Sequence, residues 1–305
     1  FYKRLAYDEI LSSFLVHSEI RQKIKKTKKK RKSFDFKYQN LNLSKLDFKL
    51  TNDQFKSLKE INDDLMSNQK MFRLLQGDVG SGKTIVALLS AYNVVKSGFQ
   101  VAIMAPTEIL ARQHFKLAQM LFSDLQINIL SSKSDYKDKK KIKRELVENK
   151  INILFGTHSI FQEKIIFNNL GLIIIDEQHK FGVNQRKKLS DKGGVNCDVL
   201  LMSATPIPRT LTMTIFGDMD LSIIREKPKN RKEVKTYSKL ETKIGDVIRF
   251  IKKEIKNENQ IFWVCPLIEE SKKIDHSSAI KKYEYLNKIF PKKVALLHGK
   301  TNQEE

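Results

Sequence analysis

Residues 77–84 have the types and spacing needed to bind a nucleotide. They read Gly-Asp-Val-Gly-Ser-Gly-Lys-Thr, the G-x-x-x-x-G-K-[ST] pattern of a phosphate-binding loop, or Walker A motif. The glycines let the backbone turn tightly and point its N–H groups at phosphate oxygens. The Lys83 ammonium can reach the β- and γ-phosphates, and the Thr84 hydroxyl can ligate Mg²⁺. The predicted cofactors are ATP and Mg²⁺, held by Gly77, Asp78, Val79, Gly80, Ser81, Gly82, Lys83 and Thr84.

The segments on either side of this loop support that interpretation. An apolar run over residues 71–75 predicts a buried strand, and residues 85–95 predict a buried helix that Gly98 can close. Strand, glycine loop and helix follow one another as a phosphate site requires, because the helix N-terminus adds partial positive charge. The alternative is a glycine-rich turn that ends in Lys-Thr by chance, and both flanks count against it.

An acidic pair supplies the second half of a hydrolytic site. Asp176 and Glu177 follow the unbroken apolar run 172–175, which predicts a buried parallel strand. In phosphoryl transfer one carboxylate holds Mg²⁺ and another orients and deprotonates the attacking water, and we assign these roles to Asp176 and Glu177 in that order. An acidic pair that merely opens a helix is the alternative. We interpret Gln178 and His179 as sensors of the γ-phosphate. The predicted catalytic residues are Lys83, Asp176, Glu177 and His179, with Thr84 and Asp176 on the metal.

Gln54 lies in a predicted helix, residues 51–70, for which Thr51 is the expected N-cap. A glutamine amide can hydrogen-bond an adenine edge with both a donor and an acceptor. Because Gln54 comes shortly before the phosphate-binding loop, we predict that it binds the base of ATP. A glutamine that simply faces solvent is the alternative.

Apolar runs alternate with helical patterns along the chain, which is typical of an α/β fold with a parallel sheet. Each polar cluster follows the carboxyl end of a predicted strand, where such sheets place their ligands. The predicted strands of the first part cover residues 71–75, 101–104, 151–155, 172–175 and 199–202. A charged segment at 226–233 indicates a linker. A second α/β pattern follows it, with predicted strands at 234–237, 261–264 and 294–297 and helices at 244–255 and 281–289.

The composition favours a polyanionic partner. The 305 residues carry a formal net charge of +22, which favours nucleic acid through neutralisation of phosphates. A Lys-, Asn- and Ile-rich composition that reflects AT-rich coding is the alternative. Nine of the twelve residues in 21–32 are basic, and this run either is solvated or follows a DNA backbone.

Other classes of protein are disfavoured. The two cysteines, Cys197 and Cys265, have no paired spacing, which argues against a disulfide or zinc framework and for a reducing compartment. No apolar run approaches the ~20 residues of a membrane span. We therefore expect no membrane association.

Five motifs resemble those of superfamily 2 helicases. They are residues 77–84, Ala-Pro-Thr-Glu at 105–108, Gly-Thr-His at 156–158, Asp-Glu-Gln-His at 176–179 and Ser-Ala-Thr at 203–205. Longer strings narrow the resemblance to the RecG family of bacterial branched-DNA helicases. These strings are Ile-Asp-Glu-Gln-His-Lys-Phe-Gly-Val at 175–183, Ala-Thr-Pro-Ile-Pro-Arg-Thr at 204–210 and Phe-Trp-Val-Cys-Pro-Leu-Ile-Glu-Glu-Ser at 262–271. Transcription-repair coupling helicases share the second string, whereas Gln178 and the string around Trp263 favour RecG.

The resemblance implies tandem RecA-like P-loop domains with parallel sheets, which bind ATP between them and move duplex DNA. We expect residues 1–50 to be a helical, basic connector from an N-terminal wedge domain. Residues 51–230 would form the ATP-binding domain 1, and residues 231–305 would begin an incomplete domain 2. The residues implied to contact DNA are Thr107, Arg112, Thr157 and His158, and those implied to couple hydrolysis to movement are Gln178, Ser203, Ala204 and Thr205.

The implied activity is an ATP-dependent helicase or translocase that regresses forks and migrates junctions in recombination and repair. The implied partners are branched DNA, namely replication forks and Holliday junctions, and a single-strand-binding protein. We expect a monomer in the bacterial cytoplasm, associated with the nucleoid.

Three alternatives remain. A basic DNA-binding module could use nucleotide only as a switch, but such a switch has no need of the Glu177 carboxylate. A translocase of the transcription-repair coupling kind is the second alternative. An RNA helicase of the DEAD-box kind is the third, and Gln178 and His179 in place of Ala-Asp argue against it.

The resemblance also carries an expectation for the 1–305 chain by itself. Motifs V and VI, with the arginine finger, would lie beyond Glu305, and a missing finger can cost ~10³–10⁵ in rate. We therefore expect this chain alone to bind ATP–Mg²⁺ weakly and to show negligible DNA-stimulated hydrolysis. Unpaired strand edges in its second lobe would favour aggregation.

Overall fold

The computed structural model describes residues 28–37, 43, 44, 46–131, 135–161, 165–177, 194–205, 219–226, 234–265 and 279–297, with isolated residues between 4 and 22. The chain divides into two compact units, residues 1–232 and residues 233–305. This division lies close to the boundary predicted after residue 230, and the roles of the two domains stay predictions. The described residues between 4 and 22 are helical.

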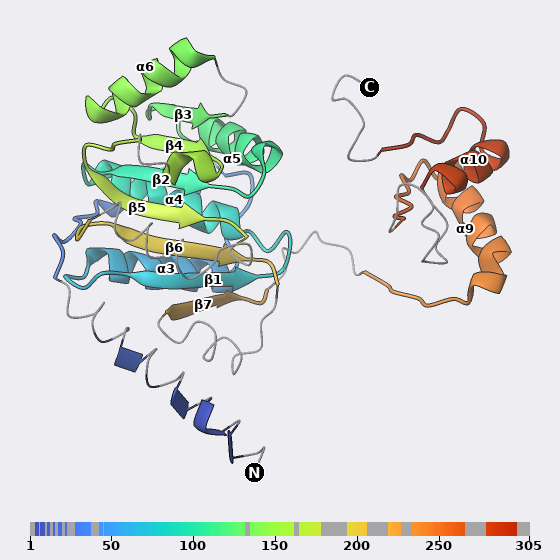
Figure 1. The fold of residues 1–305 in the computed structure, drawn as a ribbon, viewed down its shortest axis with the longest axis horizontal. Coiled ribbons are helices and arrows are strands. Elements are labelled where there is room, and N and C mark those ends of the chain that lie inside the picture. The colour runs from blue at the N-terminus through green and yellow to red at the C-terminus, as the bar shows by residue number, and fades with distance from the viewer. Residues whose placement is uncertain are drawn as a thin grey trace. The chain divides into compact units, whose positions relative to one another are not determined.

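Unit 1 is built on a seven-stranded sheet in the order β3-β4-β2-β5-β6-β1-β7 (Figure 1). Every neighbouring pair of strands is parallel, so the predicted parallel α/β fold is confirmed. The strands are β1 (Phe72–Gly77), β2 (Gln100–Met104), β3 (Ile127–Leu130), β4 (Ile153–Gly156), β5 (Leu170–Ile175), β6 (Asp198–Ser203) and β7 (Asp220–Ile224).

The sequence pattern does not predict the two edge strands, β3 and β7. Each carries a polar residue inside its apolar run, Asn128 in β3 and Ser222 in β7. An edge strand has a single hydrogen-bonded neighbour and is less enclosed than a central strand. Both strands therefore lack the unbroken apolar run that marks central strands such as β5.

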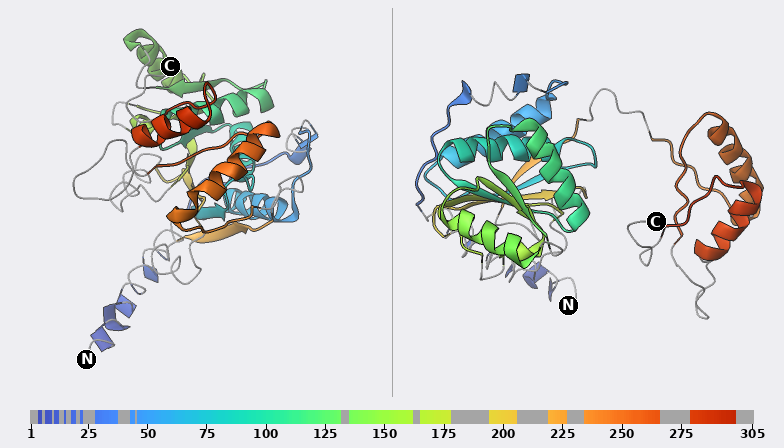
Figure 2. Two further views of the ribbon diagram at one scale, coloured as in Figure 1. Left: turned by 90° about the vertical axis from the view of Figure 1, so that its right-hand side faces the viewer. Right: turned by 90° about the horizontal axis from the view of Figure 1, so that it is seen from above.

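Helices cover both faces of the sheet (Figure 2). On one face lie α3 (Asn52–Met66), α4 (Lys83–Lys96) and α5 (Glu108–Leu121), and on the other lies α6 (Tyr136–Val147). Because side chains alternate along a strand, Leu75 packs against α3 and α4 while its neighbour Leu74 packs with Ile142 and Leu146 of α6. Within the described parts of the chain, every helix is too short or too polar to cross a bilayer.

Unit 2 contains two packed helices, α9 (Ile244–Lys256) and α10 (Ala279–Ile289), after the short 3-10 helix η3 (Glu241–Lys243). These positions agree with the predicted helices at 244–255 and 281–289. The buried residues that hold the pair together are Ile248, Ile251, Leu286 and Phe290.

The three strands predicted in unit 2 are wrong, because residues 234–237, 261–264 and 294–297 form no strand. An apolar run becomes a strand only when a neighbour completes its hydrogen-bond ladder, and no such ladder joins the described residues of unit 2. Side chains from two of the three segments pack on the helices instead: Trp263 and Val294 lie against the α9–α10 core.

A strap of residues 28–32 runs along unit 1 and is held by hydrogen bonds from its own backbone. Lys28 pairs with Gln69 in an isolated antiparallel bridge, and the Lys29 N–H donates to the Asn68 carbonyl at 2.9 Å. The Lys30 N–H donates to the side-chain oxygen of Asn196, which lies in the turn before β6. The strap is therefore part of the folded unit.

Two lysines of this strap bind one buried carboxylate. The ammonium groups of Lys29 and Lys32 each lie 2.6 Å from Oδ2 of Asp198, and all three side chains are fully buried. The other oxygen, Oδ1, accepts the Met71 N–H at 2.7 Å. Burial lowers the pKa of Lys29, because the charged amine loses its water. The sequence predicts that the basic run 21–32 either is solvated or follows a DNA backbone. Both predictions are wrong for Lys29 and Lys32, because their side chains are buried.

Asp198→Ala would leave two buried ammonium groups with backbone carbonyls as acceptors but without their counter-charge, and the Met71 N–H without its acceptor. Removing one partner of a buried ion pair costs about 3–5 kcal/mol, so we expect a loss of that order in the opening free energy of β1 and β6. Hydrogen–deuterium exchange of the β1 and β6 amides measures it. Lys30→Ala is the control, because the Lys30 side chain is exposed and the change should stay within about 0.5 kcal/mol. Unchanged exchange rates in Asp198→Ala would show that the ion pairs of Asp198 with Lys29 and Lys32 do not stabilise these strands.

Candidate active site

Five neighbouring strands end at one edge of the sheet, which we name the carboxyl edge. Strand β1 leads into the phosphate-binding loop, β5 leads into the acidic pair, and β6 leads into the turn predicted to couple hydrolysis to movement. Strands β2 and β4 lead into the predicted DNA contacts. Gln178 and His179 lie outside the described residues, so their sensor role stays a prediction. The predicted residues that the fold brings to this edge are Gly77–Thr84, Thr107, Thr157, His158, Asp176, Glu177 and 203–205.

In the phosphate-binding loop the Lys83 side chain folds back on the loop itself. Its ammonium donates to the carbonyl oxygens of Gly77 at 2.5 Å and Asp78 at 2.9 Å. Gly80 and Gly82 adopt left-handed φ angles of 74° and 88°, a conformation open to glycine. An anionic phosphate is a stronger acceptor for this ammonium than two neutral carbonyls. The loop therefore holds Lys83 ready to exchange its acceptors for a nucleotide.

The Asp176 carboxylate is held on both sides. Asp176 is 8% exposed, and its N–H donates to the Met104 carbonyl at 2.9 Å. Its Oδ1 accepts the Glu177 N–H at 3.0 Å, and its Oδ2 lies 2.9 Å from Nε2 of His114. Burial lowers the pKa of Lys83, and the charges of Asp176 and Glu177 oppose that effect. The acidic pair and the loop lysine thus share one electrostatic site.

Glu177 adopts a left-handed backbone conformation, with φ 53°. For a residue with a side chain this costs on the order of 1–3 kcal/mol, and such strain gathers at functional sites where the surrounding structure enforces it. The strained turn is a structural reason to retain Glu177 as the candidate that activates water.

The oxygen groups around the loop fit a magnesium–nucleotide complex. Ser81 Oγ is buried and has no hydrogen-bond partner in the part of the chain that the structure describes, so a ligand can use it. Mg²⁺ in such sites takes one or two protein oxygens and completes its shell with phosphates and water. The Thr84 hydroxyl and the Asp176 carboxylate are oxygen donors of this kind. Among the described residues, no group of three or more His, Cys, Asp or Glu forms a metal site.

Gln54 joins helix α3 to the phosphate-binding loop. Its Oε1 accepts the Thr51 N–H at 2.9 Å in a capping box, and its Nε2 donates to the Ser81 carbonyl at 2.7 Å. The amide retains one further N–H and one further lone pair, which is what an adenine edge requires. Contact with the base stays a prediction, and the bond to the loop is a feature that the sequence does not reveal.

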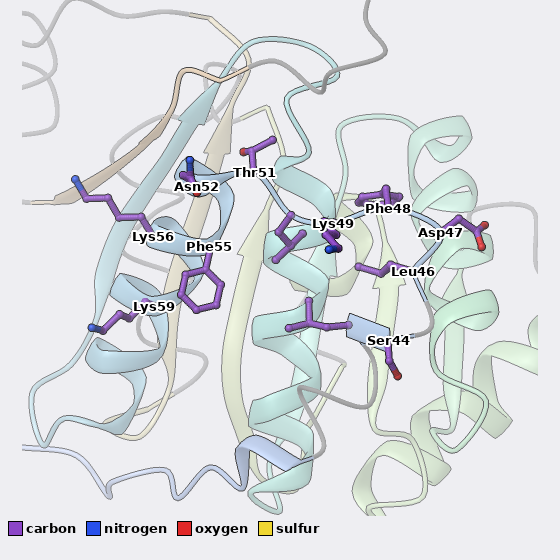
Figure 3. Close-up of a pocket in the computed structure, with 12 residues that line it drawn as sticks. Ser44, Leu46, Asp47, Phe48, Lys49, Thr51, Asn52, Phe55, Lys56 and Lys59 are labelled. Carbon is purple, nitrogen blue, oxygen red and sulfur yellow. The ribbon is translucent and has the colours of Figure 1, made fainter.

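A hollow of about 900 Å³ opens beside the start of α3 (Figure 3). Helix α3 lines one side and the segment before it lines the other. Phe48 and Phe55 contribute exposed aromatic rings, and lysines surround them. Aromatic and basic groups together suit a flat ring that carries phosphates. The lining includes Leu46, Phe48, Lys49, Phe55, Lys56 and Lys59.

The predicted DNA contacts occupy the starts of two helical segments. Thr107 is the N-cap of α5. Arg112 donates to Glu108 Oε1 at 2.8 Å and to Ser131 Oγ at 3.4 Å, so part of its donor capacity already serves the fold. The 3-10 helix η1 (His158–Phe161) follows β4 directly. Contact with DNA stays a prediction for Thr107, Arg112, Thr157 and His158.

Sequence reasoning missed Gln76 and His114. Gln76 Nε2 donates to the Thr205 carbonyl at 3.1 Å, and Thr205 Oγ1 lies 2.9 Å from Ser203 Oγ. The strand that bears the loop therefore contacts the predicted coupling turn. A polar residue at the buried end of an apolar strand is the signal that could have identified Gln76. His114 has a weaker signal, its position seven residues after Thr107 on one helix.

Residues 51–214 match the family model of the DEAD/DEAH box helicases. The matched range contains the phosphate-binding loop and the acidic pair. The chain belongs to the DEAD/DEAH box helicase family. At the position of the family's box this chain has Asp-Glu-Gln-His, residues 176–179.

The curated relatives of this chain include two bacterial RecG proteins. The ATP-dependent DNA helicase RecG of Aquifex aeolicus is 47% identical over 309 residues, which cover 100% of this chain and 39% of the relative. RecG of Thermotoga maritima is 44% identical and covers 99% of this chain, again over 39% of the relative. The chain thus spans well under half the length of the relatives it matches.

A solved structure of RecG bound to a three-way DNA junction is similar in fold. It matches with a TM-score of 0.79 and 38% identity, over 94% of this chain and 38% of that one. A DNA-bound structure of the helicase MrfA, at 16% identity and a TM-score of 0.55, shares the fold alone. The resemblance to RecG and the RecA-like helicase fold, both predicted from the sequence, are confirmed.

Gly82→Ala should weaken nucleotide binding through Gln54. A Cβ at Gly82 would lie 2.2 Å from Gln54 Nε2, and the φ of 88° is strained for alanine. Gly98→Ala is the matched control, because its φ is 86° and its Cβ would meet nothing within 4 Å. We expect at least a roughly tenfold loss of affinity for a fluorescent ATP analogue in the first variant, equivalent to ~1.4 kcal/mol, and parental affinity in the second. Equal binding by both would show that the Gln54 contact is dispensable.

Proposed function

We propose that this chain is the motor part of an ATP-dependent helicase that remodels branched DNA, by fork regression and junction migration. The observation that carries the proposal is the 47% identity to an ATP-dependent DNA helicase along the whole chain. The RecG of the similar solved structure is bound to a three-way DNA junction, which supports replication forks and Holliday junctions as substrates here. The carboxyl edge brings the residues predicted to bind nucleotide close to those predicted to bind DNA, which supports a motor.

In the proposed hydrolysis each side chain has one task. Lys83 leaves the Gly77 and Asp78 carbonyls and binds the β- and γ-phosphates. Thr84 and Asp176 would hold Mg²⁺, which would neutralise charge on the phosphates. Glu177 orients the attacking water and takes its proton. The charges of Asp176 and Glu177 act to raise the pKa of Lys83 against the effect of burial, which supports this division.

We propose that the base of ATP occupies the hollow beside α3. Gln54 would offer its free N–H and lone pair to the adenine edge, and Phe48 or Phe55 would stack on the ring. Two observations support this placement. Thr51 and Asn52, which line the hollow, come shortly before Gln54 in the chain, and Gln54 donates to the Ser81 carbonyl of the loop that would hold the phosphates.

The remaining assignments complete the proposal. Residues 51–230 would be the first helicase domain, 231–305 the beginning of the second, and 1–50 a connector to a wedge domain. The protein would act as a monomer in the bacterial cytoplasm near the nucleoid, with a single-strand-binding protein as partner. A net charge of +22 supports binding to DNA, because positive charge attracts the phosphates.

Two substitutions separate binding from hydrolysis in the full-length natural protein. Lys83→Ala should lower ATP binding, because it removes the phosphate contact. Glu177→Gln should retain ATP binding and lose on the order of 10²–10⁴ in turnover, the scale of positioned proton transfer. A coupled ATPase assay and fluorescent-nucleotide binding measure the two effects. Parental turnover in Glu177→Gln would remove Glu177 from the mechanism.

The proposed substrate class is tested by comparing forked DNA, linear duplex and RNA as stimulators of ATP hydrolysis. We expect forked DNA to stimulate most strongly, with an affinity that falls steeply with salt and depends little on base sequence, because the contacts are to phosphates. Stimulation by RNA alone would favour an RNA helicase. Binding without hydrolysis would favour a nucleotide-switched binding module, and an affinity independent of salt would contradict the proposed DNA contacts.

A further inference from the structure

His114 lies against the candidate metal ligand from a different element of the fold. It belongs to α5, is 9% exposed, and places Nε2 at 2.9 Å from Asp176 Oδ2. An ionised carboxylate only accepts hydrogen bonds, so Nε2 is the donor in this pair. The proposed hydrolysis gives His114 no task. A buried polar contact made directly to a residue of the reacting centre therefore has no role so far.

The geometry leaves Asp176 little freedom. Its Oδ1 is held by the N–H of the neighbouring Glu177, and its Oδ2 is held by His114. Each carboxylate oxygen has two lone pairs, so one on each oxygen stays available for a metal ion or its water. Loss of the His114 bond would let the carboxyl group turn about its own axis and would spread the directions of those lone pairs.

Helix α5 joins this contact to the predicted DNA site. Thr107, its N-cap, precedes His114 by seven residues, which is two helical turns or ~10 Å along one face. The start of the helix is tied to the end of β3 through Glu108, whose Oε1 accepts from the Ser131 hydroxyl at 2.5 Å. Phe115 packs edge-on against Phe155 of β4 at 6.0 Å. These contacts hold α5 on the sheet, so Thr107 and His114 keep a fixed spacing along one rigid helix.

We propose that His114 is a positioning residue: it orients the Asp176 carboxylate for the metal–nucleotide complex and links that carboxylate to the DNA-facing start of α5. The inference rests on the proposed function and deepens it. Groups that hydrogen-bond a metal ligand typically change metal affinity or activity by 10–100-fold when removed. A structural role alone would instead lower stability and leave metal affinity as it was.

The test uses three variants of the full-length natural protein. His114→Phe retains a ring of similar size and removes the donor. His114→Gln places an amide N–H at a similar distance along the side chain, so it should restore the bond. Phe122→Leu disturbs the buried end of α5 and is remote in sequence from His114, so it serves as the packing control. If His114→Phe fails to fold, His114→Asn, whose amide is one bond shorter, replaces it.

The first readout is Mn²⁺ binding in the presence of ADP, followed by electron paramagnetic resonance. We expect His114→Phe to weaken Mn²⁺ binding by roughly 10–100-fold, and His114→Gln and Phe122→Leu to bind within about threefold of the parent, a difference below 1 kcal/mol. Parental affinity in His114→Phe overturns the proposal. Equal weakening in Phe122→Leu also overturns it, because the effect would then come from packing of α5.

The second readout is the ratio of fork-stimulated to basal ATP hydrolysis at saturating Mg²⁺. We expect this ratio to fall in His114→Phe and to recover in His114→Gln, and an unchanged ratio overturns the link to DNA. A parent protein that DNA does not stimulate would overturn the proposed function instead. The Mn²⁺ measurement would still decide whether His114 positions Asp176.

Discussion

The candidate site depends on the register of the parallel sheet, in which neighbouring strands end at the same height. Met104 of β2 lies opposite both Gly156 of β4 and Ile175 of β5, and Gln76 of β1 lies opposite Ser203 of β6. The hydrogen-bond ladders thus bring loops far apart in the sequence to one edge. A slip of one residue would turn every side chain to the other face, so the buried apolar pattern that sets the register also sets the site.

Helix α3 adds a second constraint at this edge. Gln54 holds the phosphate-binding loop, and its neighbour Asp53 accepts the N–H groups of Arg225 at 2.8 Å and Glu226 at 3.0 Å. The Glu226 carboxylate in turn accepts the Asp53 N–H at 3.2 Å. Two adjacent residues therefore tie the loop to the segment through which the chain leaves unit 1. The predicted nucleotide contact of Gln54 and the tie to residues 225 and 226 thus lie on adjacent residues of α3.

The sequence predicts features whose cause is local. The loop at 77–84 is recognisable because its chemistry demands fixed residues at fixed spacing, and the central strands because both of their faces are buried. Lys29 is different: a run of like charges predicts solvation, and its burial is explained by partners remote in the sequence, Asp198 and the carbonyls of Asp64 and Leu65. The contact between His114 and Asp176 also joins distant segments. The prediction of strands in unit 2 is wrong because a strand needs a hydrogen-bonded neighbouring strand, which its own residues do not specify.

A crystal structure of the full-length natural protein with Mg²⁺ and a non-hydrolysable ATP analogue tests the nucleotide site most directly. We expect the Lys83 ammonium to leave the Gly77 and Asp78 carbonyls and to lie ~3 Å from β- and γ-phosphate oxygens, with the metal beside Thr84 and Asp176. An analogue bound away from the carboxyl edge, or a Lys83 still on those carbonyls beside a bound nucleotide, would contradict the assignment of this edge as the site of ATP hydrolysis.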